Sequence, residues 1–313
     1  MISVVIPIHN EEENIPVLLD RLQAVMGYMG RNYEIICVDD GSTDNSLALL
    51  RASIPRCPYL KVVELTRNYG QHPAVMAGFS VARGEIVITM DADLQNPPEE
   101  IPRLVEAMEK GDYEVVGTIR RLRKDPLFRR WASRIINIIT RRITGVNMAD
   151  WGCMLRAYRK SVVEKMVAYA EQATFVPALA TIFAKKIGEI EVSHEERYGG
   201  KTNYPLRKLI NLQFDLVSSF SNLPLKVLLY GGIGMSFLGT ALGLILIIAR
   251  LYFGAAWAAY GVFTLFAVLF FFIGLQFFAL GILGEYLGRI YREVRKRPVF
   301  VIEKIYEDEK KAG

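Results

Sequence analysis

Acidic and amide side chains are concentrated in one short run of the sequence, Asp91-Ala92-Asp93-Leu94-Gln95. The residues before it, 85–90, are mostly apolar and predict a buried strand of a parallel sheet. In an extended chain, residues two apart point the same way, so Asp91, Asp93 and Gln95 are expected to converge. Their oxygen atoms suit a hard cation, Mg²⁺ or Mn²⁺, shared with the phosphates of a substrate. A solvated acidic pair in a loop is the alternative interpretation of this motif taken alone.

Two further polar clusters follow predicted strands. Pro7-Ile8-His9-Asn10-Glu11-Glu12 comes after the first strand, and Asp39-Asp40-Gly41-Ser42-Thr43-Asp44 comes after the second. Ligands of open α/β sheets bind beyond the carboxyl ends of the strands, where carboxylates can accept hydrogen bonds from a base imide and from ribose hydroxyls. For Ser42 or Thr43 we favour a helix N-cap, and for Asp44 a helix-dipole partner. The strands are not followed by G-x-G-x-x-G, which disfavours a dinucleotide dehydrogenase.

These motifs lie in a region where short apolar runs alternate with longer amphipathic stretches, which is typical of βαβ units on a parallel sheet. The fold class expected is therefore α/β, with a doubly wound and mostly parallel sheet. Strands are predicted at Ser3–Pro7, Glu34–Val38, Lys61–Leu65, Glu85–Met90 and Tyr113–Gly117. Helices are predicted near 14–29, 43–52, 71–82, 98–109 and 129–143, followed by a mixed region to about 195.

The second half of the chain has the composition of a membrane protein. Overall hydrophobic content is 51%, and residues 227–249 and 251–284 carry no charge. Each run exceeds the roughly 20 apolar residues that cross a bilayer. Residues 204–220 combine apolar and basic side chains, which predicts an interfacial helix in the membrane plane. A buried helix packed under the preceding domain is the alternative.

Charge predicts how these helices are oriented. The N-terminal sequence lacks the features of a secretory signal, and basic residues flank the two spans, whereas the segment between them contributes only Arg250. Both ends are thus expected in the cytoplasm. The three cysteines show no C-x-x-C spacing, which supports neither disulfides nor zinc. The domains expected are 1–203 (catalytic), 204–225 (interfacial), 226–288 (two spans) and 289–313 (cytoplasmic tail), with Val299–Ile302 as a strand or arm against a neighbouring subunit.

Several segments resemble family 2 glycosyltransferases of GT-A fold, and within them the polyprenyl-phosphate glycosyltransferases, which move a sugar from a nucleotide donor to dolichyl or undecaprenyl phosphate. The similarity runs nearly end to end. It is carried by 6–11, 38–44, Arg67-Asn68-Tyr69-Gly70, 91–98, Leu223-Pro224-Leu225-Lys226 and 284–291. A narrower similarity at 68–72, 152–159 and 257–263 favours 4-deoxy-4-formamido-L-arabinose as the sugar.

The resemblance implies roles for individual residues. For the nucleotide it implies Pro7, His9, Glu11, Asp39, Asp91, Ala92 and Arg197, and for the metal and diphosphate Asp91, Asp93 and Gln95. Position 9 is often tyrosine in the family, so a stacking or ribose contact is kept only in part by His9. Asp150 matches the residue usually proposed as the base, and Asp93 is the other catalytic residue. A lysine common near Arg197 is Asn203 here, with Lys201 as a substitute.

The stretch from Arg120 to Arg142 holds nine arginine or lysine residues and one acid. The resemblance assigns Arg120, Arg129 and Ser133 to the phosphate of the lipid acceptor, and the planar guanidinium fork suits phosphate oxygens. A diffuse surface attracted to anionic lipid is the alternative. A nucleic-acid site is disfavoured because the stretch belongs to a domain that is expected to be anchored to a membrane.

Together these features predict inverting, metal-dependent transfer from a UDP-sugar to undecaprenyl phosphate at the bacterial inner membrane, by a homo-tetramer if the family resemblance holds. The resemblance also implies lipid A modification and resistance to polymyxin. Glucose and N-acetylglucosamine are the alternative sugars. A processive polysaccharide synthase is disfavoured, because Leu127 stands where its Q-x-x-R-W motif needs glutamine. A catalytically silent membrane scaffold or transporter subunit is the rival from another class.

Overall fold

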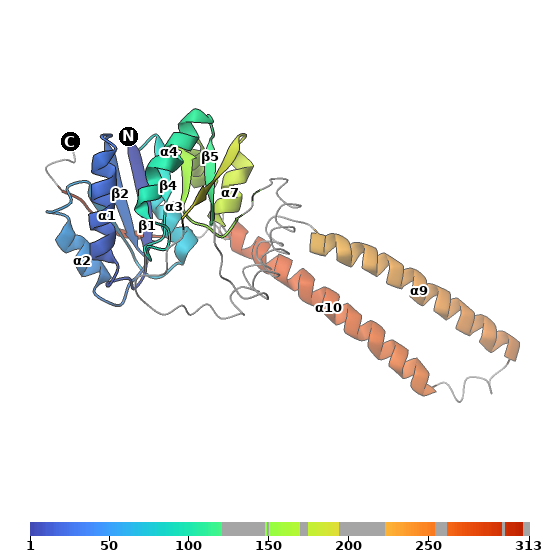
Figure 1. The fold of residues 1–313 in the computed structure, drawn as a ribbon. Coiled ribbons are helices and arrows are strands. Elements are labelled where there is room, and N and C mark those ends of the chain that lie inside the picture. Colours follow the sequence, from blue (N-terminus) through green and yellow to red (C-terminus); the bar gives the residue numbers. More distant parts are fainter. Residues whose placement is uncertain are drawn as a thin grey trace. The chain divides into compact units, whose positions relative to one another are not determined.

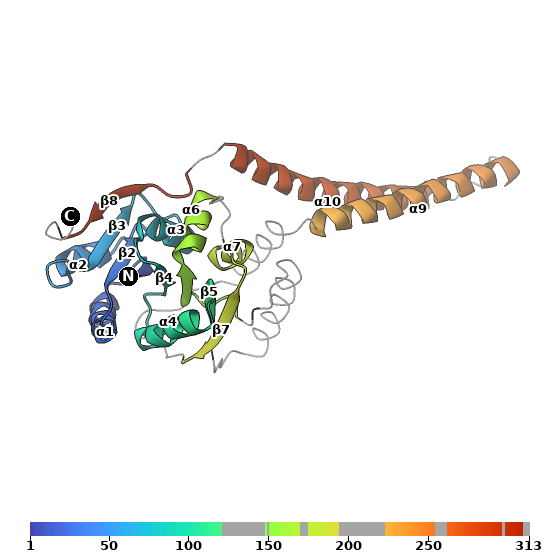
Figure 2. The ribbon, with the colours of Figure 1, turned by 90° about the horizontal axis from the view of Figure 1, so that it is seen from above.

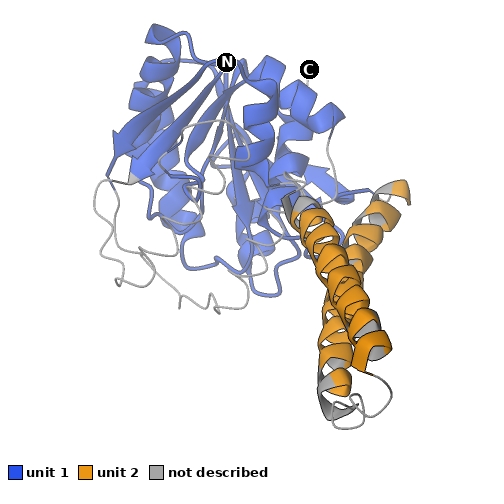
Figure 3. Cartoon of the chain, turned by 90° about the vertical axis from the view of Figure 1, so that its right-hand side faces the viewer, with its two compact units in different colours: residues 1–210, 298–313 blue, residues 211–297 orange. Residues whose placement is uncertain are grey.

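The computed structural model describes residues 1–120, 148, 150–169, 175–193, 223–253, 262–295 and 298–308. The chain divides into two compact units, one formed by residues 1–210 and 298–313 and the other by residues 211–297 (Figure 3).

The first unit is built on an eight-stranded sheet, counted over the described residues, with the order β7-β5-β6-β4-β1-β2-β3-β8. The strands are β1 (Ile2–Ile8), β2 (Tyr33–Asp39), β3 (Leu60–Leu65), β4 (Ile86–Thr89), β5 (Val115–Arg120), β6 (Arg156–Arg159), β7 (Ile187–Val192) and β8 (Ile302–Tyr306). Parallel pairing joins β1 to β2 and β4, β2 to β3, and β5 to β7. The predicted α/β class with a mostly parallel sheet is confirmed.

Helices cover both faces of this sheet (Figures 1 and 2). They are α1 (Ile15–Tyr28), α2 (Ser46–Ser53), α3 (Gln71–Val81), the 3₁₀ turn Pro98–Glu100, α4 (Ile101–Lys110), α6 (Lys160–Ala168) and α7 (Val176–Phe183). The apolar side chains of β1 alternate between two core clusters. Val4 and Ile6 pack with residues of α1 and α4, whereas Val5 packs with residues of α3 and α6. Burial on both faces explains why these strands are continuous apolar runs.

The five predicted strands and the helices predicted before residue 110 are present, with ends shifted by a few residues. The helix predicted near 129–143 lies outside the described residues. Strand β6 was not predicted, because two of its four residues are arginines. Arg156 is nevertheless fully buried, with its Nε donating to the carbonyl oxygen of Cys153 (2.8 Å) and its Nη2 to that of Asp150 (2.7 Å).

The C-terminal tail forms a strand, but β8 begins only at Ile302, the last residue of the predicted segment Val299–Ile302. It pairs antiparallel with β3 of its own chain, with Val62 opposite Tyr306, which corrects the expected arm against a neighbouring subunit (Figure 2). The Tyr306 hydroxyl donates to Glu64 Oε2 (2.7 Å), and the buried Lys61 Nζ lies 3.7 Å from Glu307 Oε2. The apolar side chain of Ile302 packs against the core cluster of α3. Strand β8 is therefore the outermost strand on this side of the sheet.

The second unit contains two long helices, α9 (Leu223–Phe253) and α10 (Val262–Val294). Segments Val227–Ile245 and Phe271–Gly288 within them are long and apolar enough to cross a membrane, and the residues described in these segments are not buried inside the protein. Long apolar helices in the core of a soluble protein would be buried, so this exposure favours contact with lipid. The predicted interfacial helix at 204–220 lies outside the described residues.

Because β8 covers the edge of β3, removing it should destabilise the first unit. Deleting residues 298–313 exposes the apolar core residues that Ile302 covers and leaves the backbone of β3 unpaired on that side. The deletion should therefore lower the free energy of unfolding by about 2 kcal/mol or more. Thermal unfolding of the detergent-solubilised protein measures this change. The control deletion, 309–313, lies beyond β8 and should leave the unfolding temperature unchanged. Equal unfolding temperatures for the two deletions would contradict this role of β8.

Candidate functional site

The predicted site residues that the structure describes lie at the end of the sheet where the parallel strands β1, β2 and β4 have their carboxyl ends. Pro7 is near the end of β1, Asp39 ends β2, and Asp91 follows β4 by two residues. Strand β6 is antiparallel to β4, with Thr89 opposite Arg156, so the start of β6 lies at the same edge as the end of β4. The segment preceding β6 includes Asp150. The antiparallel strand thus adds a carboxylate to those at the ends of parallel strands.

Asp39 is the most unusual of these carboxylates. Its side chain is buried, and Oδ2 accepts a hydrogen bond from the backbone N–H of Ser42 (3.3 Å). The other oxygen, Oδ1, is enclosed and has no hydrogen-bond partner among the described residues. Burial raises the pKa of Asp39 above the ordinary aspartate value, although hydrogen bonds from Ser42 oppose the change. An enclosed acceptor without a donor is costly unless a ligand supplies one, and an imide N–H would do so.

The adjacent carboxylate, Asp40, is also buried but is fully engaged within the protein. Its Oδ1 accepts from the backbone N–H of Tyr69 (2.7 Å), and its Oδ2 accepts from that of Gly70 (2.8 Å). The family resemblance assigns Asp39 to the nucleotide, and no role is predicted for Asp40. Successive residues at a strand end point in opposite directions, which is the signal that distinguishes them.

The loop after β1 is tied to the loop after β2. The backbone N–H of Asn10 donates to Ser42 Oγ (3.1 Å), and that of Thr43 donates to Asn10 Oδ1 (2.8 Å). The N-cap predicted for Ser42 or Thr43 is wrong, because α2 begins at Ser46 and its N-cap position is Asn45, while Ser42 and Thr43 link the two loops. Asp44 serves the helix instead, as its Oδ1 accepts from the N–H of Ser46 at the start of α2 (3.0 Å).

His9 and Glu11 are held by this arrangement. The Nδ1 atom of His9 lies 2.9 Å from the carbonyl oxygen of Asp40. The side-chain nitrogen of Asn68, Nδ2, is 3.1 Å from each ring nitrogen of His9. Glu11 Oε2 accepts from the side-chain amide of Asn14 (2.5 Å). The two predicted nucleotide contacts thus lie on the loop that borders Asp40.

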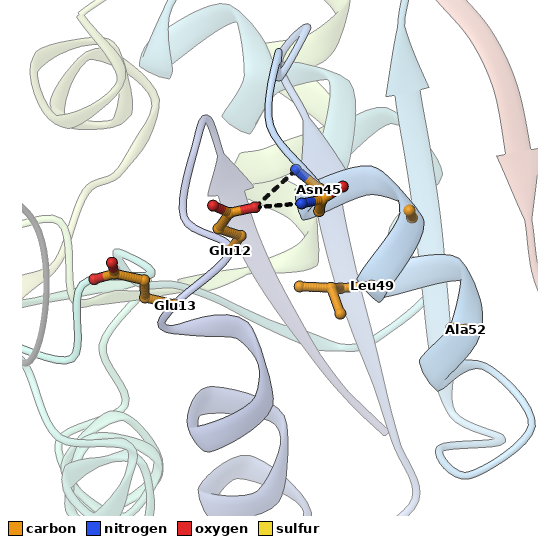
Figure 4. A pocket seen from close by; sticks show the side chains of 6 residues that line it. Glu12, Glu13, Asn45, Leu49 and Ala52 are labelled. Atoms are coloured by element: carbon orange, nitrogen blue, oxygen red, sulfur yellow. Dashed lines mark hydrogen bonds between the residues drawn. The ribbon is translucent and has the colours of Figure 1, made fainter.

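An open pocket lies beside this loop, between the segment before α1 and helix α2 (Figure 4). It is lined by Glu12, Glu13, Asn45, Ala48, Leu49 and Ala52. Glu12 Oε2 accepts from both the backbone N–H (3.0 Å) and the side-chain amide (2.9 Å) of Asn45. The predicted site residues do not line this pocket, so we assign it no part in the site.

The Asp91–Gln95 segment differs from the extended strand that the sequence analysis assumed. Strand β4 ends at Thr89, Ala92 and Asp93 form a turn, and Leu94 has a positive φ of 59°. Asp93 Oδ1 accepts from the backbone N–H of Gln95 (3.1 Å), which is an Asx-type turn. Because the segment is not extended, residues two apart do not have to point the same way. The turn determines where the side chains of Asp91, Asp93 and Gln95 point.

The donor set of this turn fits Mg²⁺ or Mn²⁺. The described residues include no group of three or more histidine, cysteine, aspartate or glutamate side chains arranged to hold a metal ion. Mg²⁺, however, is usually bound by one or two carboxylates together with water and substrate phosphates. Asp91 and Asp93 supply carboxylates of this kind beside the sheet edge, and Asp91 Oδ1 accepts from Gln71 Nε2 (2.6 Å).

Asp150 is buried next to a fixed turn. Its Oδ1 accepts from the backbone N–H of Gly152 (3.0 Å), and its carbonyl oxygen is held by buried Arg156. Thr89 Oγ1 donates to the carbonyl oxygen of Met154 (2.6 Å), which ties this segment to the end of β4. Arg156 was not predicted to support the site, since the sequence gives no sign that an arginine here is buried.

The remaining predicted residues are not placed by the structure. Arg129, Ser133 and Arg197, with Lys201 and Asn203, lie outside the described residues, and for Arg120 only its position at the end of β5 is described. The acceptor-phosphate site therefore stays a prediction.

The sequence of the chain is similar to those of known proteins. Residues 3–167 match the family model for glycosyl transferase family 2. The chain belongs to this family. A relative from Pseudomonas paraeruginosa is 53% identical over 97% of this chain and 90% of its own length. One from Pectobacterium atrosepticum is 55% identical over 97% and 93%. Both are named undecaprenyl-phosphate 4-deoxy-4-formamido-L-arabinose transferase.

Solved structures of this glycosyltransferase fold agree. Glucosyl-3-phosphoglycerate synthase from Mycobacterium tuberculosis, in complex with Mn²⁺, UDP and glucosyl-3-phosphoglycerate, gives a TM-score of 0.50 at 21% identity, over 70% of this chain and 80% of that one. Mannosyl-3-phosphoglycerate synthase from Rubrobacter xylanophilus gives 0.51 at 14% identity, over 74% and 75%. At this identity the likeness shows the GT-A fold alone, as predicted from the sequence.

Within the described part of the chain, Asp39 Oδ1 has no hydrogen-bond donor. Asp39→Asn keeps one oxygen and replaces the other by an NH2 group, and the backbone N–H of Ser42 favours the orientation in which the remaining oxygen accepts from it. The NH2 group then takes the place of Oδ1, so UDP should bind about ten- to a hundredfold more weakly if its imide donates there. Calorimetric titration of the purified protein with UDP measures the change. Asp20→Asn, at an exposed position of α1, is the matched control. Undiminished UDP affinity in Asp39→Asn would show that the imide does not bind there.

Proposed function

We propose that this glycosyltransferase moves 4-deoxy-4-formamido-L-arabinose from its UDP derivative to undecaprenyl phosphate, with inversion at the anomeric carbon. The main support for glycosyl transfer is that Asp39, the Asp91–Asp93 turn and the Asp150 segment lie around one sheet edge. The choice of sugar and lipid is supported by relatives of that name, which are similar over nearly the whole chain. The product would serve lipid A modification and resistance to polymyxin.

In the donor site, Pro7, His9, Glu11 and Asp39 hold the uridine, and Asp39 Oδ1 accepts from the base. Asp91, Asp93 and Gln95 would hold Mg²⁺ or Mn²⁺ with the diphosphate, and Ala92, between the two aspartates, would contact the nucleotide. A divalent ion supplies charge that stabilises the leaving UDP. Arg197 binds the diphosphate from the segment after β7.

The acceptor needs little base catalysis. A phosphate monoester has a second pKa of about 6, so much of it is already a dianion at neutral pH. One of its oxygens attacks the anomeric carbon while the bond to UDP breaks, and UDP leaves with the electron pair. Arg120, Arg129 and Ser133 neutralise and orient the phosphate. Asp150 orients the acceptor or takes a residual proton.

The membrane topology proposed is a hairpin with both ends in the cytoplasm. Strand β8 follows α10 and belongs to the same sheet as β1–β4, so the chain returns to the first unit after its two long helices. If each helix crosses the bilayer once, the catalytic unit and β8 lie on one side and residues 254–261 on the other. The basic residues that flank the spans support a cytoplasmic location for that shared side. We retain the homo-tetramer as a proposal.

The metal-dependent step gives a direct test. Asp93→Ala should reduce transfer to near the background rate, because the carboxylate that accepts from Gln95 is also proposed to hold the ion. Divalent-dependent binding of UDP should weaken with it, while the unfolding temperature stays close to that of the unsubstituted protein. Product formation is measured from labelled UDP-sugar into extractable lipid. Full activity of Asp93→Ala, or unchanged turnover of the unsubstituted protein in EDTA, would contradict the proposal.

A further inference from the structure

The segment from Arg67 to Gln71, between β3 and α3, contacts the ends of three other strands. Asn68 reaches His9 after β1, and the amides of Tyr69 and Gly70 donate to Asp40 after β2. Gln71 reaches Asp91 after β4. In the sheet order β4-β1-β2-β3, this one loop therefore crosses from the end of β3 to the end of β4.

The conformation of this loop is closely constrained. Both carboxylate oxygens of the buried Asp40 are used to hold its backbone, as described above. Gly41 has a φ of 63°, and a Cβ at that position would lie 2.5 Å from the backbone nitrogen of Asn68. Gly70, immediately before α3, has a φ of 101°. Glycine is the residue that adopts such backbone angles without strain, and the close approach at Gly41 leaves no room for a side chain.

Helix α3, which begins at Gln71, is fixed as firmly as the loop. A Cβ on Gly78 would lie 2.3 Å from Val5 on β1 and 3.1 Å from Val38 on β2, so the helix lies directly on these two strands. The first residue of α3 is thus held both by the loop before it and by the helix that it begins. The side-chain amide of Gln71 therefore lies at the strand ends where the nucleotide donor is proposed to bind.

The contact between Gln71 and Asp91 is short and charge-assisted. Gln71 Nε2 donates to Asp91 Oδ1 over 2.6 Å. A donor on one oxygen fixes the rotation of the carboxylate, and so determines how Asp91 is presented to a ligand. Gln71 does not have to touch the ligand for this effect.

We propose that Gln71 is a positioning residue for the donor diphosphate, acting through Asp91, and that Asp40 sets its place by holding the loop. This rests on the proposed function, in which Asp91 binds the donor with a divalent ion. The recognised ligand is a nucleoside diphosphate with that ion, and the lipid acceptor is not affected.

The test compares two substitutions of Gln71 in the full chain. Gln71→Met keeps the length of the side chain and removes the N–H donor, whereas Gln71→Glu keeps its shape and places a second carboxylate against Asp91. The matched control is Gln23→Met on α1. UDP binding in the presence of Mn²⁺ is measured by calorimetry, and the KM values for UDP-sugar and undecaprenyl phosphate are measured by transfer.

We expect the Kd for UDP and the KM for UDP-sugar to rise roughly tenfold in Gln71→Met, because the hydrogen bond to the charged Asp91 is lost. Both should rise further in Gln71→Glu, because two carboxylates then repel each other at this contact. The KM for undecaprenyl phosphate and the unfolding temperature should stay unchanged, as should all values for Gln23→Met. Wild-type UDP affinity in Gln71→Met, or an equal rise in both KM values, would overturn the proposal. If the unsubstituted protein did not bind UDP with Mn²⁺, the donor site itself would be wrong.

Discussion

The arrangement of the site depends on the cost of burying a charge. Strands β1, β2 and β4 are covered by helices on both faces, so a carboxylate inside the sheet needs a compensating charge, as the buried Glu34 of β2 has in Lys61 (3.2 Å). The carboxylates of the site occur instead where a strand leaves the core. Because parallel strands end at the same edge, their first polar residues are brought together there. Asp39 and Asp40 show two outcomes of this constraint. Asp40 is paired with two backbone amides and supports a loop, whereas Asp39 keeps one enclosed oxygen that receives no hydrogen bond from the part of the chain that the structure describes.

The parts of the fold that could be predicted are those with a regular pattern. Alternation of apolar runs and amphipathic stretches predicted the parallel strands and their helices, because burial on two faces leaves a continuous apolar sequence. Strand β6 has no such pattern, since Arg156 satisfies its guanidinium with backbone carbonyls of a neighbouring turn. Pairing between distant segments was also hidden, and it placed β8 on the edge of its own sheet.

The candidate site was predicted more completely in its residue types than in its geometry. Positions after strands predict the carboxylates, but an extended chain is not what Asp91–Gln95 forms: the segment is a turn with a positive φ at Leu94. The roles of Asp40, Asn68 and Gln71 depend on contacts between residues separated by 20 or more positions in the sequence. Such contacts have no local signature, so they emerge only when the strand ends are placed together.

At the carboxyl ends of these strands the protein is proposed to transfer a specific sugar from UDP to a lipid phosphate. This reaction is tested most directly by incubating the purified full chain with undecaprenyl phosphate, Mg²⁺ or Mn²⁺ and a panel of UDP-sugars, and then measuring the mass of the lipid product by mass spectrometry. We predict a product carrying 4-deoxy-4-formamido-L-arabinose, formed only with the divalent ion. Efficient transfer of glucose or N-acetylglucosamine with none of the formamido sugar would contradict the donor assignment, and the absence of any lipid-linked sugar would contradict the function as a whole.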